Sequence, residues 1–382
     1  MNSTPALLDM IAALISAPSV SSVSPELDQG NRNVIDLLAG WLDTAGFEVE
    51  LMPLAGMPAK ANLVATLGSG PGGLVLSGHT DTVPFDAGRW THDPFTLTRA
   101  DDRLYGLGTS DMKAFLALAI EALVDIRPAD LREPVILLAT ADEETSMAGA
   151  KALVERGTPQ ARHALIGEPT GLRPVKMHKG ILMEAIRLQG RSGHSSDPAL
   201  GNSALEAMHT VIGALLAWRA QLQARHHNTL FAVPVPTLNL GHIHGGDNPN
   251  RICADCELHI DLRPLPGMAL EELRAGIHAC VNRSLRGFGI QVTFESLFDG
   301  IPAMETAADA EIIRVTEKLT GHAAGSVAFG TEAPYLQQLG MNTVVLGPGD
   351  IAQAHQPDEY LALDRLDPTI RLLRDLVKSV CT

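Results

Sequence analysis

Apolar residues in the first 170 positions alternate between short continuous runs and longer stretches with helical spacing. Short apolar runs predict the buried strands of a parallel sheet, and the helical stretches predict helices that cover both of its faces. The predicted strands are 62–67, 74–77, 135–141 and 164–166, and the predicted helices are 31–45, 110–126 and 147–156. This part of the chain therefore predicts an α/β fold with a mostly parallel sheet.

The pattern changes near Lys179. From there the elements follow the order strand, helix, two strands, helix and strand, which is the βαββαβ order of a ferredoxin-like domain. They lie at 181–189, 201–223, 237–244, 251–263, 269–285 and 290–295, after which a helix at 308–319 and a strand at 342–346 resume the first pattern. We therefore predict a discontinuous domain of residues 1–178 and 297–382, with an inserted domain of residues 179–296.

Length and charge narrow the class of protein. A chain of 382 residues is long for one core, and 45% hydrophobic with 19% charged residues is typical of a soluble globular enzyme. The net charge of −15 argues against nucleic acid and an anionic membrane surface as partners, because both require a basic face. We find no bilayer-spanning apolar stretch, no basic signal segment and no disulfide-rich pattern, so we expect a cytoplasmic location.

Residues with metal-ligand chemistry follow the predicted strands, where open α/β sheets bind their ligands. His79 closes one strand, and Asp81 lies two residues later. A metal-bound imidazole needs an acceptor on its other ring nitrogen, and Asp81 can supply one. Most His-x-Asp sequences are ordinary surface residues, but the position at a strand end favours a metal ligand here.

Asp111 stands where the helical pattern of 110–126 begins, after a glycine-rich segment. The simpler interpretation is that Ser110 or Asp111 caps this helix, which is a common role for both residue types. The alternative is a carboxylate that bridges two metal ions and keeps both oxygens free for them.

Three acidic residues, Asp142, Glu143 and Glu144, follow the apolar strand 135–141, and Glu168 follows the strand 164–166. Adjacent glutamates on a surface are usually only solvated. At one sheet edge, however, these carboxylates repel each other, and a bound cation stabilises them. Neighbouring residues can then divide the work, with one binding the metal and the other accepting a proton from water as general base.

Two histidines complete the candidate site. His355 follows the strand 342–346 and a Gly-Pro-Gly loop, which places it at the same sheet edge. His194 belongs to the inserted domain, so it is expected to act on the site from that domain rather than as a direct ligand. A nitrogen and oxygen ligand set without sulfur suits zinc, cobalt or manganese.

Seven segments of the chain resemble the acetylornithine deacetylase and succinyl-diaminopimelate desuccinylase family of two-metal amidohydrolases. The resemblance covers essentially the whole chain, and its first three segments together are highly specific. It implies a zinc-aminopeptidase-like catalytic domain, with the inserted ferredoxin-like domain as lid and dimerisation unit. The matching segments are Ser77–Pro84, Gly106–Lys113, Ala141–Thr145, Gly167–Thr170, Gly193–Pro198, Asn239–Asp247 and Gln353–Tyr360.

By position, the resemblance implies two divalent metal ions per subunit, zinc or alternatively cobalt. One ion would be held by His79 and Glu168, and the other by Glu144 and His355. Asp111 would bridge the two ions.

The resemblance also implies the roles of other site residues. Asp81 would orient His79, and Glu143 would be the general base and acid. His194 would stabilise the oxyanion from a neighbouring subunit, which implies a homodimer formed through the lid.

Substrate contacts follow from the same resemblance. Asn250 and Arg263 match lid positions that contact the substrate carboxylate, and Glu332 is placed to meet the ammonium of ornithine. For Arg263, an ordinary role as a surface arginine at a strand end is an equal alternative.

The resemblance implies metal-dependent hydrolysis of the amide bond of a small-molecule substrate, with N2-acetyl-L-ornithine in arginine biosynthesis as the leading case. Another N-acylamino acid, a dipeptide or N-succinyl-diaminopimelate is an open alternative with the same chemistry. A non-catalytic binding protein on the same scaffold is a second alternative. The presence of Glu143 beside Glu144 favours the enzyme, because a non-catalytic relative has no need of a general base.

Overall fold

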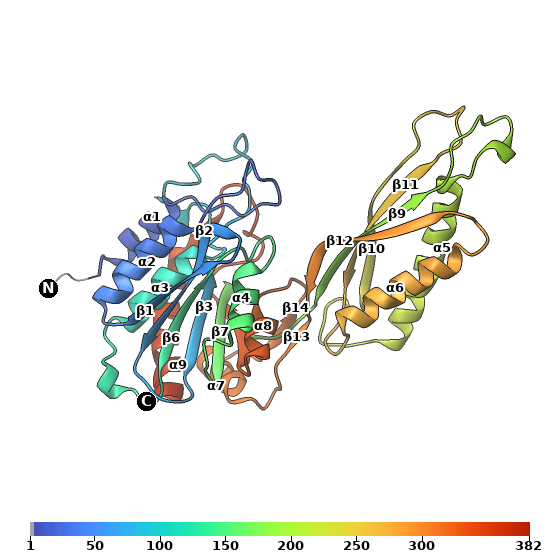
Figure 1. The fold of residues 1–382 in the computed structure, drawn as a ribbon. Coiled ribbons are helices and arrows are strands. Elements are labelled where there is room, and N and C mark those ends of the chain that lie inside the picture. The colour runs from blue at the N-terminus through green and yellow to red at the C-terminus, as the bar shows by residue number, and fades with distance from the viewer. Residues whose placement is uncertain (1–3) are drawn as a thin grey trace. The chain divides into compact units, whose positions relative to one another are not determined.

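The computed structural model describes residues 4–382, which divide into two compact units (Figure 1). The first contains the described residues up to Lys176 together with 306–325 and 331–382. The second contains 177–305 and 326–330. The second unit extends past the predicted boundary at 296 because its last long strand, β12, continues to Ile301 and still pairs there with Ile181.

A mixed sheet forms the centre of the first unit, with neighbouring strands in the order β1-β2-β6-β3-β7-β15. β3 pairs in parallel with β6 and β7, and β7 pairs in parallel with β15, whereas β2 is antiparallel to β1 and β6. The sheet is thus mostly parallel where the predicted site lies. The bounds are β1 Glu48–Leu54, β2 Met57–Leu67, β3 Leu74–His79, β6 Val135–Thr140, β7 His163–Pro169 and β15 Asn342–Gly347.

Helices cover this sheet because its central strands are apolar on both faces. One hydrophobic core joins five of the helices to alternate strand residues such as Leu74 and Leu76. Every residue of the central helix α3 except Glu121 is buried. The five helices are α1 Leu7–Ile15, α2 Arg32–Thr44, α3 Lys113–Leu123, α7 Glu311–Thr320 and α9 Leu366–Cys381.

The helices α4 (Ala148–Arg156) and α8 (Ala333–Gln338) pack against each other, and they contact β1 and β15 respectively. Three short strands form a separate small sheet in the order β16-β5-β4. Their bounds are β4 Thr98–Ala100, β5 Arg103–Tyr105 and β16 Tyr360–Ala362. Its β5–β16 pairing brings the segment before Asp111 next to the segment after His355. Three short strands lie where the chain passes between the units: β8 Val175–His178, β13 Met304–Glu305 and β14 Gly325–Val327.

The second unit is a four-stranded antiparallel sheet in the order β10-β11-β9-β12, with the helices α5 and α6 packed on it. The chain order βαββαβ is the predicted ferredoxin-like order. In β11, buried Cys256, Leu258, Ile260 and Leu262 alternate with partly exposed polar residues, so one face of the sheet packs on the helices. The bounds are β9 Ile181–Gln189, α5 Ala204–Arg225, β10 Thr237–Gly245, β11 Asp255–Arg263, α6 Leu270–Ser284 and β12 Gln291–Ile301.

All four cysteines are free thiols. Within residues 4–382, no helix combines the length and the apolar content needed to cross a bilayer.

Candidate metal centre

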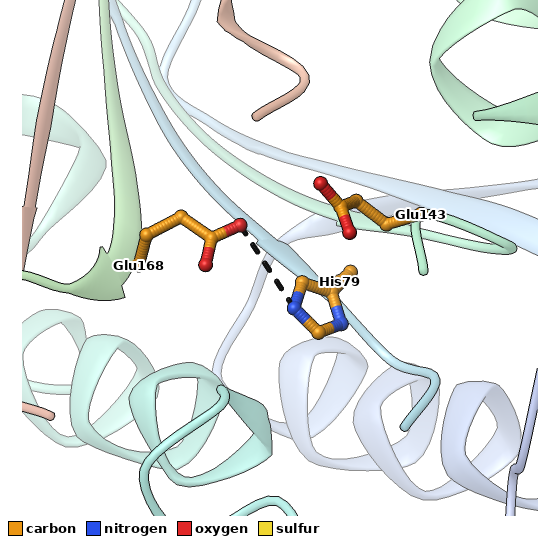
Figure 2. A group of neighbouring side chains, drawn as sticks. All are labelled: His79, Glu143 and Glu168. Carbon is orange, nitrogen blue, oxygen red and sulfur yellow. Dashed lines mark ion pairs between the residues drawn. The ribbon is translucent and has the colours of Figure 1, made fainter. Parts of the chain in front are cut away.

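The candidate site lies at the carboxyl ends of three neighbouring strands. His79 is the last residue of β3, Glu168 lies near the end of β7, and Glu143 follows β6 in a short loop. Figure 2 shows the three side chains turned toward one another. His79 and Glu168 are 1% and 5% exposed, and His79 Nε2 lies 3.9 Å from Glu168 Oε1. The parallel pairing of β3 with both neighbours brings them together.

Asp111 lies between the two candidate histidines. Its Oδ1 is 3.1 Å from His79 Nε2, and its Oδ2 is 3.7 Å from His355 Nε2. Helix α3 begins only at Lys113, and its cap residue, Met112, makes no side-chain capping hydrogen bond. The prediction that Ser110 or Asp111 caps this helix is therefore wrong, because the chain enters the helix two residues later. Each oxygen of Asp111 faces a different imidazole, as a bridging carboxylate requires.

His355 and Glu144 form the other end of the cluster. His355 Nε2 lies 3.1 Å from Oε1 and 3.2 Å from Oε2 of Glu144. The His355 side chain is 53% exposed, whereas that of Glu144 is 10% exposed. This side of the cluster is therefore open to solvent, and the His79 side is closed.

Two overlapping groups of ligand atoms result. Within the described part of the chain, one group contains His79, Glu143 and Glu168, and the other contains His79, Asp111 and Glu144. The ligand atoms of each group lie within 4.8 Å of one another. Sets of carboxylate and imidazole groups at this spacing suit divalent cations such as zinc.

The charges in the cluster also fit a cation site. Burial and the nearby charge of Glu168 raise the pKa of Glu143 well above its usual value. Burial and the charge of Asp111 do the same to the pKa of Glu168. Burial alone would lower the pKa of His79, but a hydrogen bond to Asp111 and the surrounding carboxylates raise it well above its usual value. Carboxylates so crowded are each stabilised by added positive charge.

Asp81 supplies the acceptor for His79 through its backbone rather than through its carboxylate. His79 Nδ1 lies 2.9 Å from the main-chain oxygen of Asp81, whereas the carboxylate Oδ1 is 3.8 Å away. The other carboxylate oxygen accepts the N–H of Glu144 at 3.1 Å. Burial raises the pKa of Asp81 to about 6. Asp81 thus holds the imidazole with its backbone and the Glu144 loop with its side chain.

Asp142 points away from the cluster that its two neighbours enter. Its carboxylate accepts hydrogen bonds from the Lys60 ammonium and from the hydroxyls of Ser21 and Ser146. Lys60 and Asp142 are 7% and 2% exposed at their side chains. The expectation that all three acidic residues face one edge is therefore wrong for Asp142. Lys60 was not a predicted site residue, and the available signal was a lone lysine between alanines in a predominantly apolar segment.

Glu332 lies just before helix α8 and is 1% exposed. One carboxylate oxygen accepts the hydroxyl of Ser77, and the other accepts that of Thr140 at 2.7 Å. Burial raises the pKa of Glu332. These hydroxyls come from β3 and β6, two strands whose ends form the site.

The remaining predicted residues belong to the second unit. His194 is exposed, and its Nδ1 lies 2.7 Å from Ser196 Oγ. The Asn250 side chain lies in an exposed loop, and the Arg263 guanidinium is paired with Asp261, with Nε 2.9 Å from Oδ1. Their contacts to a substrate or to a second subunit remain predictions.

The site gathers carboxylates and imidazoles at the carboxyl edge of a mostly parallel sheet, and the chain contains an inserted ferredoxin-like unit. This combination is typical of a metal-dependent hydrolase with two domains. The chain belongs to the family described as Peptidase family M20/M25/M40, which it matches over residues 75–379.

Individual relatives are similar along their full length. The chain is 48% identical to an acetylornithine deacetylase from Pasteurella multocida over 100% of both chains. It is 51% identical to an acetylornithine deacetylase from Edwardsiella ictaluri over 99% of this chain and 98% of the relative. An M20 family metallo-carboxypeptidase from Sulfolobus solfataricus has a similar fold, with a TM-score of 0.78 at 16% identity, covering 98% of this chain and 99% of that one.

Proposed function

We propose that this protein hydrolyses N2-acetyl-L-ornithine to L-ornithine and acetate. The observation that carries the proposal is its identity of 48–51% to acetylornithine deacetylases over essentially the whole chain. The site is compatible with this reaction, because a partly buried carboxylate, Glu143, shares one cluster with metal-ligand side chains. We further propose that the protein acts in arginine biosynthesis, in the cytoplasm.

The metal centre would hold two divalent ions, with zinc as the first choice and cobalt as the alternative. His79 and Glu168 would hold one ion, Glu144 and His355 the other, and Asp111 both, in line with the distances among their side chains. Such ions, when bound, lower the pKa of water and polarise the amide carbonyl.

Glu143 would handle the proton of the reaction. It would take a proton from the attacking water as the new C–O bond forms, and deliver that proton to the leaving α-amino nitrogen as the C–N bond breaks. Burial and the charge of Glu168 raise the pKa of Glu143 above the usual glutamate value, and a raised pKa makes a carboxylate a stronger base. Asp81 supports this step by holding His79 and the Glu144 N–H.

The second unit would serve as the lid and the dimer contact. His194 would stabilise the oxyanion of the reacting carbonyl from the partner subunit, and Asn250 and Arg263 would contact the substrate carboxylate. Glu332 would contact the ornithine ammonium. Because Ser77 and Thr140 already satisfy the Glu332 carboxylate, a structural role for Glu332 competes with this assignment, and substrate selectivity decides between them.

Hydrolysis by the purified protein tests the proposal. Metal-free protein, prepared with a chelator, is incubated with zinc or cobalt and then with acetylornithine, succinyl-diaminopimelate or dipeptides. We expect metal-dependent release of free amine, with the highest kcat/KM for acetylornithine. A higher kcat/KM for another acylated amino acid or a dipeptide would transfer the function to that substrate. Binding of acetylornithine without turnover by fully metallated protein would show a non-catalytic binding protein.

A further inference from the structure

A buried carboxylate outside the predicted site holds the chain that carries Asp111. Glu359 is 1% exposed, and its Oε1 accepts three main-chain hydrogen bonds. The donors are the N–H groups of Gly108 at 3.1 Å, Ser110 at 2.7 Å and Asp111 at 3.0 Å. In addition, the main-chain oxygen of Glu359 accepts the N–H of Gly106 at 3.0 Å.

The segment from Gly106 to Asp111 needs such an acceptor. It connects β5 to α3 without regular secondary structure, and Gly106 and Gly108 have φ angles of 153° and 90°. No helix or strand ladder therefore supplies partners for the N–H groups that point to Glu359. Buried N–H groups without an acceptor destabilise the fold. One carboxylate oxygen from a distant part of the chain satisfies three of them.

Glu359 also joins two parts of the metal centre. It lies four residues after His355, and it is followed directly by β16, whose Tyr360 pairs with Tyr105 of β5. The loop that carries Asp111 begins directly after Tyr105, so the antiparallel pairing places the start of this loop beside Glu359. The carboxylate of Glu359 thus fixes the distance between the main chain at Asp111 and the segment that carries His355.

Glu359 is not placed to be a metal ligand itself. Neither group of neighbouring ligand atoms in the described chain includes it, and its Oε1 is occupied by three donors. We propose that Glu359 is a positioning residue that holds Asp111 in register with His355 and thereby sets the metal affinity of the site. This inference rests on the proposed metal centre.

The test is a metal titration of three variants at this position. Glu359→Gln keeps an oxygen at the same reach and removes the charge, Glu359→Asp keeps the charge and shortens the reach by one methylene, and Glu359→Leu removes the acceptor. Metal-free protein of each variant is titrated with zinc by calorimetry. The visible absorption of the cobalt-loaded protein reports the ligand geometry at the same time.

We expect Glu359→Asp and Glu359→Leu to bind zinc about 10–100-fold more weakly than wild type, which is the usual effect of losing a residue that orients metal ligands. Glu359→Gln should stay within about 3-fold, because its oxygen still reaches the three N–H groups. The cobalt absorption should shift in the Asp and Leu variants and stay unchanged in the Gln variant. If Glu359→Leu fails to fold, Glu359→Asp, the milder change, carries the test.

The neighbouring Asp358 provides a matched control. Its Oδ1 accepts the main-chain N–H groups of Thr91 at 2.8 Å and His92 at 3.0 Å, so it holds a different loop in the same manner. Asp358→Asn should leave zinc affinity unchanged.

Two results would overturn the proposal. Folded Glu359→Asp with wild-type zinc affinity shows that the reach of the carboxylate is irrelevant. Weak binding by Glu359→Gln together with normal binding by Glu359→Asp shows that charge, rather than position, is what matters. Failure of the proposed function is seen separately, because in that case wild-type protein itself does not bind zinc or does not hydrolyse acetylornithine.

Discussion

The ammonium of Lys60 is paired with the carboxylate of Asp142, directly before the residues Glu143 and Glu144 of the candidate site. Both side chains are almost fully buried. Asp142 has a left-handed conformation, with φ 62°, and its main-chain oxygen accepts the N–H groups of Ser146 and Met147. The ion pair therefore fixes the turn that sends Asp142 to one side and the two glutamates to the other.

Breaking this pair should destabilise the protein. We expect Lys60→Met to lower the free energy of unfolding by about 3–5 kcal/mol, because it leaves the buried Asp142 carboxylate without its counter-ion. Denaturant unfolding followed by circular dichroism measures the change. The matched control is Arg32→Met, which removes an exposed pair with Asp36 and should cost less than about 1 kcal/mol. Equal losses in the two variants would contradict the importance of the buried pair.

The same pair predicts how stability depends on pH. Burial works against ionisation of Asp142, but hydrogen bonds from Lys60 and two serines lower its pKa overall. A lowered pKa stabilises the fold above the ordinary pKa of aspartate, and this stabilisation is lost as the pH falls through the lowered value. Wild type should therefore lose its advantage over Lys60→Met in acid. A difference between the two proteins that stays constant below the ordinary aspartate pKa would contradict this.

Glu143→Gln should abolish turnover without removing metal. A positioned general base contributes about 10²–10⁴-fold, and Glu143 is proposed to return the proton as well. Kinetics with acetylornithine and metal content by elemental analysis are measured on the same sample. Activity within a few-fold of wild type would show that another group accepts the proton.

Asp111→Ala should lower the metal content of the site. Asp111 is the residue whose two oxygens face two histidines, so its removal weakens both metal positions. Elemental analysis after dialysis against metal-free buffer measures the loss, and Glu143→Gln, which retains all five proposed ligands, is the matched control. Full occupancy in Asp111→Ala would rule out a bridging role.

Glu332→Gln distinguishes a substrate contact from a structural role. If Glu332 meets the ornithine ammonium, kcat/KM should fall more for acetylornithine than for the neutral acetylmethionine. If its role is only to accept the hydroxyls of Ser77 and Thr140, both substrates should suffer equally. Thr140→Val, which removes one of these hydroxyls and leaves the carboxylate charge in place, is the control for the structural effect.

If His194 is the proposed oxyanion donor, His194→Ala should reduce kcat by about 10²–10³-fold and leave metal content intact. Contribution from the partner subunit is tested by mixing two inactive proteins, Glu143→Gln and His194→Ala. A hybrid dimer then contains one site with both residues, and activity returns. Verified hybrids that stay inactive would show that His194 acts within its own chain or has no catalytic role.

The sequence determined the fold class and most of the candidate ligands. Continuous apolar runs identify buried strands, and the carboxyl ends of parallel strands meet at one edge. His79, Glu143 and Glu168 are all attached to such ends, so their convergence follows from local pattern and connectivity alone. The βαββαβ order of the second unit is likewise a matter of local periodicity. Helix α9 is not among the predicted elements, although its apolar residues lie on one face.

Only the tertiary structure decided where neighbouring acidic side chains point. Asp142 and Glu143 are adjacent and chemically alike, yet one contacts Lys60, 82 residues away, and the other lies in the candidate metal centre. Likewise, the Glu359 carboxylate accepts a hydrogen bond from the N–H of Asp111, which lies 248 residues earlier in the chain. The direction of a side chain in a loop depends on which distant donors folding brings near it, because a buried carboxylate is stable only beside such donors. The periodicity of apolar residues along the chain does not identify those distant partners.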